Sequence, residues 1–485
     1  MQHYLAVDLG ATSGRTVLCS YDGGSVAMRE FTRFENPQLP LGGYVYWDLP
    51  HLYNEILKAL RQVSAEGVEL TSIGIDTWGC DFAFFSKDGQ PLGLPHCYRD
   101  PYTDGEMERF FSERMTQEEL YQRTGIQFMP FNSIFQLSAQ LRAGSVALAQ
   151  ADKVLFIPDA LIYMLTGEAV CEYTVASTSQ LLNPRTGDLD ETLLKALGLG
   201  RERFGRLVMP GEQVGTLTPQ VQAATGLGAV RVVAVGSHDT ASAVAAVPAE
   251  DTDYAYLSCG TWSLLGIESP EPIITEASYQ NNFTNEGGLE GTTRFLKNIC
   301  GLWLFENCRR EFRGVPEKIG PLTALCETSS FEGIILPDDP SFAHPDSMCE
   351  AIRCFCLSSG QPSPQSPADF IRCIYRSLAL RYRQVIELLS GMASFPIRRL
   401  HVIGGGSLNP HLMQMAADCT GLPVVAGPSE GTALGNTLVQ IKAAGGVRTL
   451  PEMRAIVGRS VSLKTYEPHP SKAWEDTYDK FKSLK

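Results

Sequence analysis

The sequence predicts an α/β protein built from two lobes, and two observations support this. Each half of the chain opens with two apolar strands joined by a small, hydroxyl-rich turn, and continues with strands that alternate with amphipathic helices. With 485 residues, the chain is longer than one hydrophobic core usually serves. The short acidic segment VPAEDTD at 247–253 lies between the halves, so we expect lobes at 1–246 and 247–485.

The N-terminal half is expected to begin with sheet and one helix. Strand-forming runs at 4–9 and 15–21 precede the turn signal YDGGS, and apolar residues recur at helical spacing within 49–67. The stretch 70–93 is typical of a strand, a tight segment, a second strand and an Asp-Gly hairpin. Helical patterns then dominate to about residue 200.

The C-terminal half begins in the same way. DYAYLSCGTWSLLGIE at 253–268 is typical of strand, turn and strand, and its turn resembles that of AVDLGATSG at 6–14, an indication that one lobe duplicates the other. Helices are expected at 301–312 and 369–391. The stretch 398–446 then predicts strand, Gly-rich turn, helix, strand and helix, which is an α/β unit.

Composition excludes several classes of protein. The net charge of −14 disfavours nucleic acid and anionic membranes as partners. No apolar run approaches the length of a membrane span and no signal peptide is evident, so we expect a cytoplasmic monomer or small homo-oligomer. The thirteen cysteines form no C-x-x-C pair, which predicts buried reduced thiols and leaves open one bridge, such as Cys356 with Cys373.

The turn after the first strand is a candidate phosphate site. It lacks the spacing of a dinucleotide fingerprint and the lysine of a P-loop. Its backbone N–H groups and the hydroxyls of Thr12 and Ser13 could surround phosphate oxygens, with Arg15 adding a charge. Asp8 would then face phosphate, which implies an intervening Mg²⁺. The alternative is an ordinary hairpin whose Asp8 bonds its own turn, and the motif alone slightly favours it.

The segment 229–251 predicts a strand, a break and an Ala-rich helix, and the break holds GSHDT. Asp239 is either the N-cap of that helix or a catalytic base that the helix dipole keeps ionised. A weak base suits phosphoryl transfer, in which the incoming hydroxyl loses its proton late. His238 and Thr240 would contact the same substrate, although a single histidine is more often a packed residue.

The segment GIDTWGCDF at 74–82 is a candidate sugar site. Trp78 offers a flat face for a sugar ring, with Asp76 and Asp81 on either side of it in sequence. Gly79 would let backbone approach a ligand closely. The alternative is a bulge with Trp78 in the core.

Four residues of the second half could also contact ligands. Thr261 lies in the second strand–turn–strand, and FLKNICGLWLFE places Asn298 and Glu306 on a helical pattern. Gly404–Gly406 could admit a flat ring against backbone, ahead of a helix N-terminus. The alternatives are core packing for the helix and a generic αβ turn for the glycines.

These motifs together resemble the FGGY carbohydrate kinases of the actin–hexokinase–heat-shock ATPase superfamily, over nearly the whole chain. The stretches that carry the resemblance are DLGATSGR, GYVYWD, IGIDTWGCDF, YQRTGIQFMPFNS, FIPDALIYMLTG, GSHDTAS, LSCGTWSLLG, TNEGGLEG, LKNICGLWL and GGGSLN. The resemblance implies two ribonuclease-H-like (actin/hexokinase-type) lobes with an active-site cleft between them. The first lobe would bind sugar and one phosphate group, and the second would bind nucleotide.

The resemblance also implies roles for particular residues. Asp239 would be the proton acceptor, in addition to the role of Asp8 beside the metal ion that its position before the turn indicates. The implied sugar-binding residues are Gly79, His238, Asp239, Thr240 and Asn298. The implied ATP-binding residues are Ala11, Thr12, Ser13, Gly14, Arg15, Thr261, Glu306 and Gly405. Glu306 stands where a neutral amide would be expected, so its role stays open.

The implied reaction uses ATP and Mg²⁺ to convert L-rhamnulose to L-rhamnulose 1-phosphate. A kinase for another ketose or polyol, such as L-fuculose, L-xylulose or glycerol, is the nearest alternative. An actin-like ATPase that transfers no phosphate to sugar is an alternative of a different class, as is an inactive sugar sensor.

Overall fold

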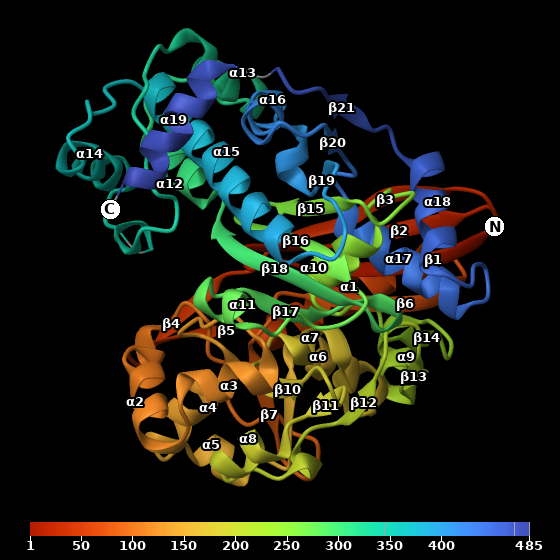
Figure 1. Ribbon diagram of the computed structural model, residues 1–485. Helices are drawn as coiled ribbons and strands as arrows, with labels where there is room; N and C mark the ends of the chain where they lie inside the picture. The colour runs from red at the N-terminus through yellow and green to blue at the C-terminus, as the bar shows by residue number, and fades with distance from the viewer. Residues whose placement is uncertain (344, 470, 485) are drawn as a thin grey trace. The chain divides into compact units, whose positions relative to one another are not determined.

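The computed structural model describes residues 1–343, 345–469 and 471–484 (Figure 1). It contains two compact units, each discontinuous in sequence. Unit 1 comprises Met1–Pro248, Glu268–Phe295 and Gly431–Ser460, and unit 2 comprises Ala249–Ile267, Leu296–Glu430 and the chain from Val461 onward. The predicted class, α/β in two parts with mixed sheets, is confirmed, whereas a single boundary at 246/247 stays a prediction.

Unit 1 is built on a six-stranded mixed sheet. Its strand order is β13 (Gln213–Thr216), β14 (Arg231–Val233), β6 (Leu70–Thr77), β1 (Gln2–Leu9), β2 (Ser13–Tyr21) and β3 (Val26–Glu35). β6 lies parallel to both β1 and β14, whereas β2 is antiparallel to β1. The carboxyl ends of β1 and β6 therefore meet at one edge of the sheet, which is where ligands bind in open α/β sheets.

Helices cover the sheet because its central strands are apolar on both faces. The predicted helix near 49–67 is confirmed as α1 (Leu49–Ala65), whose buried side chains share a core cluster with those of β1 and β6. The short α10 (Asp239–Ala245) packs against α17 (Gly431–Ala443), and α17 also contacts β1 and β6. The last part of unit 1, α18 (Leu450–Ser460), contacts β3 and α10.

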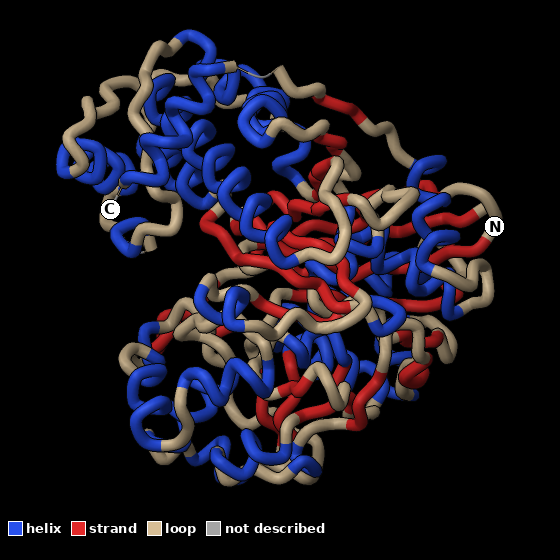
Figure 2. Tube along the Cα trace, in the orientation of Figure 1, coloured by secondary structure: helices blue, strands red, loops and turns tan. Residues whose placement is uncertain are grey.

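The remainder of unit 1 is largely helix and loop, as predicted (Figure 2). Its helices are α2 (Glu106–Glu113), α3 (Gln117–Thr124), α4 (Ser133–Arg142), α5 (Val146–Gln150), α6 (Ile157–Thr166), α7 (Tyr173–Ser177), α8 (Glu191–Ala196), α9 (Pro219–Thr225) and α11 (Glu276–Gln280). Most of this part has a core of its own, whereas α6 and α9 pack into the core of the first sheet. Short strand pairs join β4 (Gln38–Leu41) to β5 (Tyr44–Trp47), β9 (Val170–Glu172) to β12 (Arg206–Val208), and β10 (Leu182–Asn183) to β11 (Asp188–Leu189). β7 (Phe82–Phe85) pairs with a distant strand, β8 (Lys153–Phe156). The expected Asp-Gly turn forms beside it, since Phe85 bridges antiparallel to Pro91 and the N–H of Ser86 donates to the carbonyl of Gln90.

A second sheet repeats the arrangement of the first. Its order is β17 (Thr284–Gly287), β18 (Thr293–Cys300), β16 (Trp262–Ser269), β15 (Tyr254–Cys259), β19 (Arg399–Ile403), β20 (Val424–Ala426) and β21 (Lys464–Tyr466). β15 pairs antiparallel with β16 and parallel with β19, as β1 does with β2 and β6. The two strand–turn–strand segments thus have the same place in their sheets, as their similar sequences indicated.

The helices of unit 2 include the two that the sequence predicted most clearly. They are α12 (Trp303–Glu311), α13 (Ile319–Ala324), α14 (Met348–Ser358), α15 (Pro367–Met392), α16 (Pro410–Thr420) and α19 (Lys472–Ser483). All thirteen cysteines are free thiols, Cys356 and Cys373 among them. None of the helices in the described part of the chain combines the length and apolar character that a membrane crossing requires.

Glycines allow the backbone of α17 to pack closely against α10 and β6. A Cβ atom on Gly435 of α17 would lie 1.7 Å from the carbonyl oxygen of Ser242 in α10. A Cβ on Gly74 of β6 would lie 2.6 Å from Oδ1 of Asn436. Close packing at these positions therefore depends on the absence of a side chain.

We expect Gly435→Ala to destabilise unit 1, because the new methyl group would displace backbone rather than a flexible side chain. Overpacking of this kind costs about 1–3 kcal/mol, so the thermal unfolding midpoint should fall. Gly458→Ala in α18 is the matched control, because nothing lies within 4 Å of its added Cβ. That control should be neutral or stabilising by up to about 1 kcal/mol, and equal midpoints for the two variants would contradict the packing argument.

Candidate functional site

Three charged side chains lie in register across the carboxyl edge of the first sheet. Asp8 is paired with Arg15 on β2 and with Asp76 on β6, so all three side chains emerge on the same face. Nε and Nη2 of Arg15 donate to Oδ2 of Asp8 at 2.9 and 2.7 Å. The two residues predicted to hold phosphate and metal are therefore bonded to each other.

Asp76, beside Asp8 on the neighbouring strand, has a fully buried carboxyl group. Its Oδ2 accepts a hydrogen bond of 2.6 Å from Nδ2 of Asn436, whereas its Oδ1 has no partner among the described residues. Burial raises the pKa of Asp76 well above its usual value, and the nearby charges of Asp8 and Asp239 raise it further. The three acids are thus close enough for their charges to interact.

The segment that carries Asp239 is held on two sides. The N–H of Thr77 donates to the carbonyl of Ser237 at 2.9 Å, which joins the segment to the end of β6. On the other side the N–H of Ser237 donates to Oε2 of Glu172, and the N–H of His238 donates to Oγ1 of Thr174. Burial raises the pKa of Glu172 to about 7, although hydrogen bonds to its carboxyl group oppose this.

Asp239 does not cap the helix that it begins, so its interpretation as an N-cap is wrong. His238 holds the N-cap position, and Oδ1 of Asp239 accepts from the Thr240 hydroxyl at 3.0 Å. About a third of the Asp239 side chain is exposed. Removal of the carboxylate from water raises its pKa, His238 lowers it and Asp8 raises it.

His238 and Thr240 are both buried beside Asp239. Nε2 of His238 lies 3.5 Å from Oδ1 of Asp239, and its Nδ1 lies 3.1 Å from Nη2 of Arg294. Glu286 completes this group, with Oε2 at 3.4 Å from the same Nδ1. The Nδ1 edge of the His238 ring therefore contacts a buried ion pair, and its Nε2 edge faces the candidate base.

The tryptophan of the candidate sugar site lies in the core. Trp78 is 6% exposed and packs on Trp47 at a ring distance of 4.3 Å. Asp81 accepts hydrogen bonds from both indoles and from Gln136, and burial raises its pKa to about 6. These contacts favour the packing interpretation of Trp78.

Gly79 is explained in part by the same packing. A Cβ atom there would lie 2.7 Å from the hydroxyl oxygen of Thr178. The residue nevertheless remains partly exposed, two positions beyond the end of β6. A role beside a ligand is therefore compatible with its position.

The first hairpin turn is open to solvent at its tip. The N–H of Gly10 donates to the carbonyl of Ser13, and Thr12 is exposed, with Ala11 and Ser13 partly exposed. Asn36 braces the turn through its side chain, which donates to the carbonyl of Gly10. Gly14 is buried instead, and a Cβ there would meet the Phe34 ring at 2.3 Å, so packing accounts for this glycine.

The four predicted ligand residues of the second half all lie in unit 2. Thr261 is exposed in the turn between β15 and β16. The helical placement of Asn298 is wrong, because Asn298 lies in strand β18 and the helix begins only at Trp303. Glu306 is on α12, where it pairs with Arg309 at 3.4 Å.

The three consecutive glycines after β19 meet different structural constraints. Gly404 has a φ of 85°, and a Cβ on Gly406 would lie 2.2 Å from the sulfur of Cys259. Gly405 has neither constraint, because its added Cβ would meet nothing within 4 Å. Open space beside this one glycine is consistent with contact to a ligand.

Four buried polar residues of the site were missed by sequence reasoning, namely Glu172, Glu286, Arg294 and Asn436. The only signal for Asn436 is that it and Gln440 lie four residues apart, which places both on one face of a helix. Their side chains are hydrogen-bonded to each other at 2.7 Å. Glu286 and Arg294 have no comparable signal, because each fits the local pattern of a strand.

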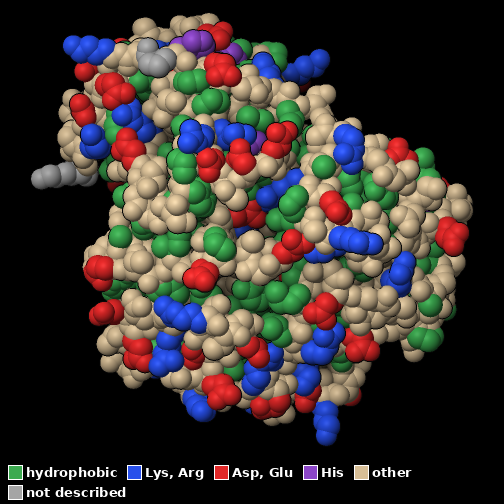
Figure 3. All heavy atoms as spheres, turned by 45° about the vertical axis from the view of Figure 1, so that its right-hand side comes forward, with side chains coloured by type: hydrophobic (Ala, Val, Ile, Leu, Met, Phe, Trp, Pro, Cys, Tyr) green, Lys and Arg blue, Asp and Glu red, His purple; other side chains and the backbone are tan. Residues whose placement is uncertain are grey.

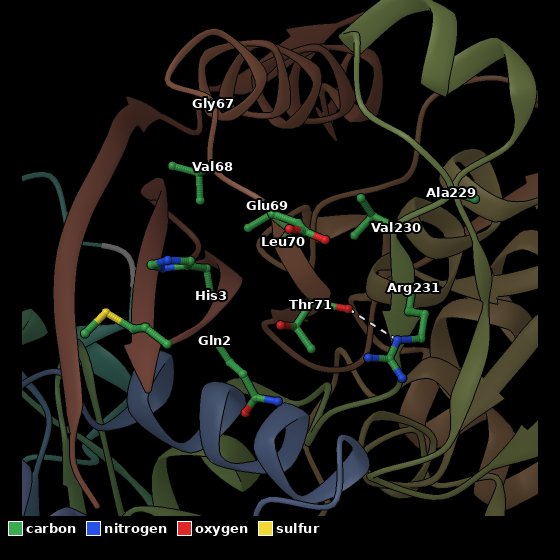
Figure 4. Close-up of a pocket in the computed structure, with 11 residues that line it drawn as sticks. Gln2, His3, Gly67, Val68, Glu69, Leu70, Thr71, Ala229, Val230 and Arg231 are labelled. Atoms are coloured by element: carbon green, nitrogen blue, oxygen red, sulfur yellow. Dashed lines mark hydrogen bonds between the residues drawn. The ribbon is translucent and has the colours of Figure 1, made fainter. Parts of the chain in front are cut away.

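A separate concavity of about 750 Å³ lies at the opposite edge of the first sheet (Figure 4). It is lined by residues at the amino ends of β1, β6 and β14, where Nε of Arg231 donates to the carbonyl of Thr71 at 3.3 Å. Asp8 and Asp76 stand at the other ends of β1 and β6. This concavity is therefore not part of the acidic site.

Comparisons with known proteins agree with the motifs over most of the chain. The N-terminal domain of the FGGY family of carbohydrate kinases matches residues 3–246, and the C-terminal domain matches residues 255–444. A rhamnulokinase of Bacteroides thetaiotaomicron is 52% identical, covering 99% of both chains. One of Pectobacterium carotovorum is 43% identical, covering 100% of this chain and 97% of that protein.

Solved structures share the fold at low identity. The ligand-bound xylulose kinase of Lactobacillus acidophilus has a TM-score of 0.80 at 16% identity, covering 100% of this chain and 96% of that one. The glycerol kinase of Plasmodium falciparum with ADP has a TM-score of 0.79 at 14% identity, covering 100% and 97%. Since both domain models and whole-length relatives agree, the chain belongs to the FGGY family of carbohydrate kinases.

Proposed function

We propose that this protein is a rhamnulokinase, which transfers the γ-phosphoryl group of ATP to L-rhamnulose in rhamnose breakdown. The products are L-rhamnulose 1-phosphate and ADP. The observation that carries the proposal is 52% identity to a rhamnulokinase over 99% of both chains. Identities of 40–43% to five further rhamnulokinases support the same substrate.

Asp239 is the proton acceptor in the proposed reaction. The primary hydroxyl of the sugar attacks the γ-phosphorus in line with the departing ADP oxygen, and its proton passes to the Asp239 carboxylate. A partly exposed side chain with a raised pKa supports this role, since it is accessible to substrate and more basic than an ordinary aspartate. The hydrogen bonds to Ser237 and His238 hold the backbone that positions it.

Gly79, His238 and Thr240 are the proposed sugar contacts in unit 1. They are grouped by the backbone bridge between Thr77 and His238, which brings the end of β6 beside the segment before α10. Asn298 on β18 is the proposed sugar contact in unit 2. Its amide can both donate and accept hydrogen bonds, which suits a polyhydroxy ligand.

The proposed ATP contacts lie in both units. In unit 1 they are the residues of the first hairpin turn, Ala11, Thr12, Ser13, Gly14 and Arg15. In unit 2 they are Thr261, Gly405 and Glu306. The exposed Thr12 and Thr261 hydroxyls and the open space beside Gly405 support this assignment.

The residues fit a magnesium ion that is bound chiefly by the nucleotide. Among the described residues no three His, Cys, Asp or Glu side chains are grouped to hold a metal ion by themselves. Mg²⁺ commonly uses one or two carboxylates together with phosphate and water, and Asp8 would supply such a carboxylate. When bound, the ion would neutralise charge on the phosphates, and the mutual repulsion of Asp8, Asp76 and Asp239 favours a cation there.

Location and assembly stay predictions, namely a cytoplasmic monomer or small homo-oligomer without a nucleic-acid or membrane partner. On the face shown in Figure 3, lysine and arginine side chains are interspersed with aspartate and glutamate. Together with the net charge of −14, this supports the expectation that small molecules are the main ligands.

A panel of sugars tests the proposed substrate. We expect ADP release, measured by a coupled assay, to be fastest with L-rhamnulose and at least about tenfold lower in kcat/KM with L-fuculose, L-xylulose and glycerol, because mismatched hydroxyls leave polar groups unpaired. A higher kcat/KM with one of the other sugars would reassign the substrate within the family. ATPase activity that no sugar changes would instead favour an ATPase without sugar transfer.

Asp239→Asn tests the proposed base. This nearly isosteric change removes the proton acceptor, so kcat should fall by about 10²- to 10⁴-fold with little change in the KM for ATP. Asp22→Asn is the matched control, because Asp22 lies in the exposed turn between β2 and β3 and should leave kcat unchanged. Near wild-type turnover by a folded Asp239→Asn protein would rule out Asp239 as the base.

A further inference from the structure

The His238 ring is enclosed by three charged side chains, all within unit 1. Asp239 faces its Nε2, whereas Arg294 and Glu286 both face its Nδ1. The side chain is 10% exposed, so water contributes little to the choice of which nitrogen carries the proton. That choice is therefore made by the protein.

Arg294 is held firmly behind the ring. It is fully buried in β18, its Nε donates to the carbonyl of Gly287 at 2.8 Å, and its Nη1 lies 3.1 Å from Oε2 of Glu286. The N–H of Gly287 in turn donates to the Ser177 hydroxyl at 2.7 Å. The guanidinium group thus has little freedom to turn away from His238.

The hydrogen bond from Arg294 determines which nitrogen of the His238 ring carries the proton. A guanidinium group only donates hydrogen bonds, so the contact of 3.1 Å from Nη2 requires Nδ1 of His238 to be the acceptor. In a neutral imidazole the proton then resides on Nε2.

Glu286 does not reverse this choice. Burial alone would raise its pKa, but the Arg294 guanidinium group, with Nη1 at 3.1 Å from Oε2, holds the pKa of Glu286 below its usual value, so the carboxylate is ionised. Its charge is matched by the guanidinium group that lies closer to the ring nitrogen than it does. A proton on Nδ1 would face the Glu286 carboxylate, but it would also face the closer Arg294 cation, which repels it.

We propose that Arg294 is a positioning residue that holds His238 in the tautomer with its proton on Nε2, so that this N–H is presented to a sugar oxygen next to the reacting hydroxyl. The distance of 3.5 Å from Nε2 to Asp239 is longer than a good hydrogen bond, which leaves the N–H available to substrate. The sugar contact rests on the proposed function, whereas the tautomer does not. The ligand class is a sugar with an acceptor oxygen adjacent to its primary hydroxyl.

Two variants separate this role from a merely structural one, because both break the same ion pair. Glu286→Gln retains the donor to Nδ1, whereas the double variant Arg294→Met with Glu286→Gln removes it without leaving a buried charge unpaired. Proteins labelled with ¹⁵N in histidine are compared by long-range ¹H–¹⁵N correlation without substrate. His238→Gln identifies the signals of His238.

We expect the Nε2–H tautomer in the wild-type protein and in Glu286→Gln, and its loss in the double variant. The kcat/KM for the sugar should fall at least about tenfold further in the double variant than in Glu286→Gln, with the KM for ATP unchanged. An Nδ1–H tautomer in either the wild-type protein or Glu286→Gln would overturn the proposal, even if the double variant does not fold. Equal tautomers and equal kcat/KM in both variants would do the same.

These outcomes are distinct from failure of the proposed function. If the wild-type protein phosphorylates none of the sugars, the proposed function fails while the tautomer measurement still stands. If L-rhamnulose is a substrate but His238 carries its proton on Nδ1, only the role of Arg294 fails.

Discussion

The parallel pairing of β1 with β6 is the constraint on which the site depends. It places Asp8 directly beside Asp76 at the ends of two buried strands, where neither carboxylate can move far without breaking the ladder. The backbone bond from Thr77 to Ser237 extends this register by one more segment and brings Asp239 to the same edge. The mutual repulsion of the acids is thus imposed by hydrogen bonds between main chains, and the stability of the core maintains it.

Part of this repulsion is relieved by a polar connection inside unit 1. Ser72 donates to Gln440, Gln440 donates to the side-chain oxygen of Asn436, and Asn436 donates to Asp76. The chain of hydrogen bonds crosses from β6 to α17 and back, in a region where Gly74 and Gly435 permit the close approach. Buried networks of this kind specify one arrangement of their elements, since any shift leaves several polar groups without partners.

Local patterns in the sequence were sufficient for the fold but only for part of the site. The hairpin at Gly10, the helix α1 and the long helix α15 follow from periodicity and turn residues, which act over a few positions. The sequence predicts a helix at Asn298 because apolar spacing continues across Gly301, whereas the strand that contains Asn298 ends at Cys300. Asn436 meets Asp76 across 360 residues, and Arg294 meets His238 across 56, so no local pattern could reveal either contact. The identification of Asp239 as base and the grouping of ligand residues from both units stay predictions.

The repeated order of the two sheets has a consequence for how such a protein can arise. Two residues before the turn glycine, β1 has Asp8 and β15 has Ser258, so equivalent places carry a charge in one copy and a hydroxyl in the other. A gene that doubled an ancestral half would start with the same chemistry twice. Loss of the acid from one copy leaves an uncharged strand end, as at Ser258, that is free to diverge. The other copy keeps its carboxylate, Asp8, so the two copies can take different functions.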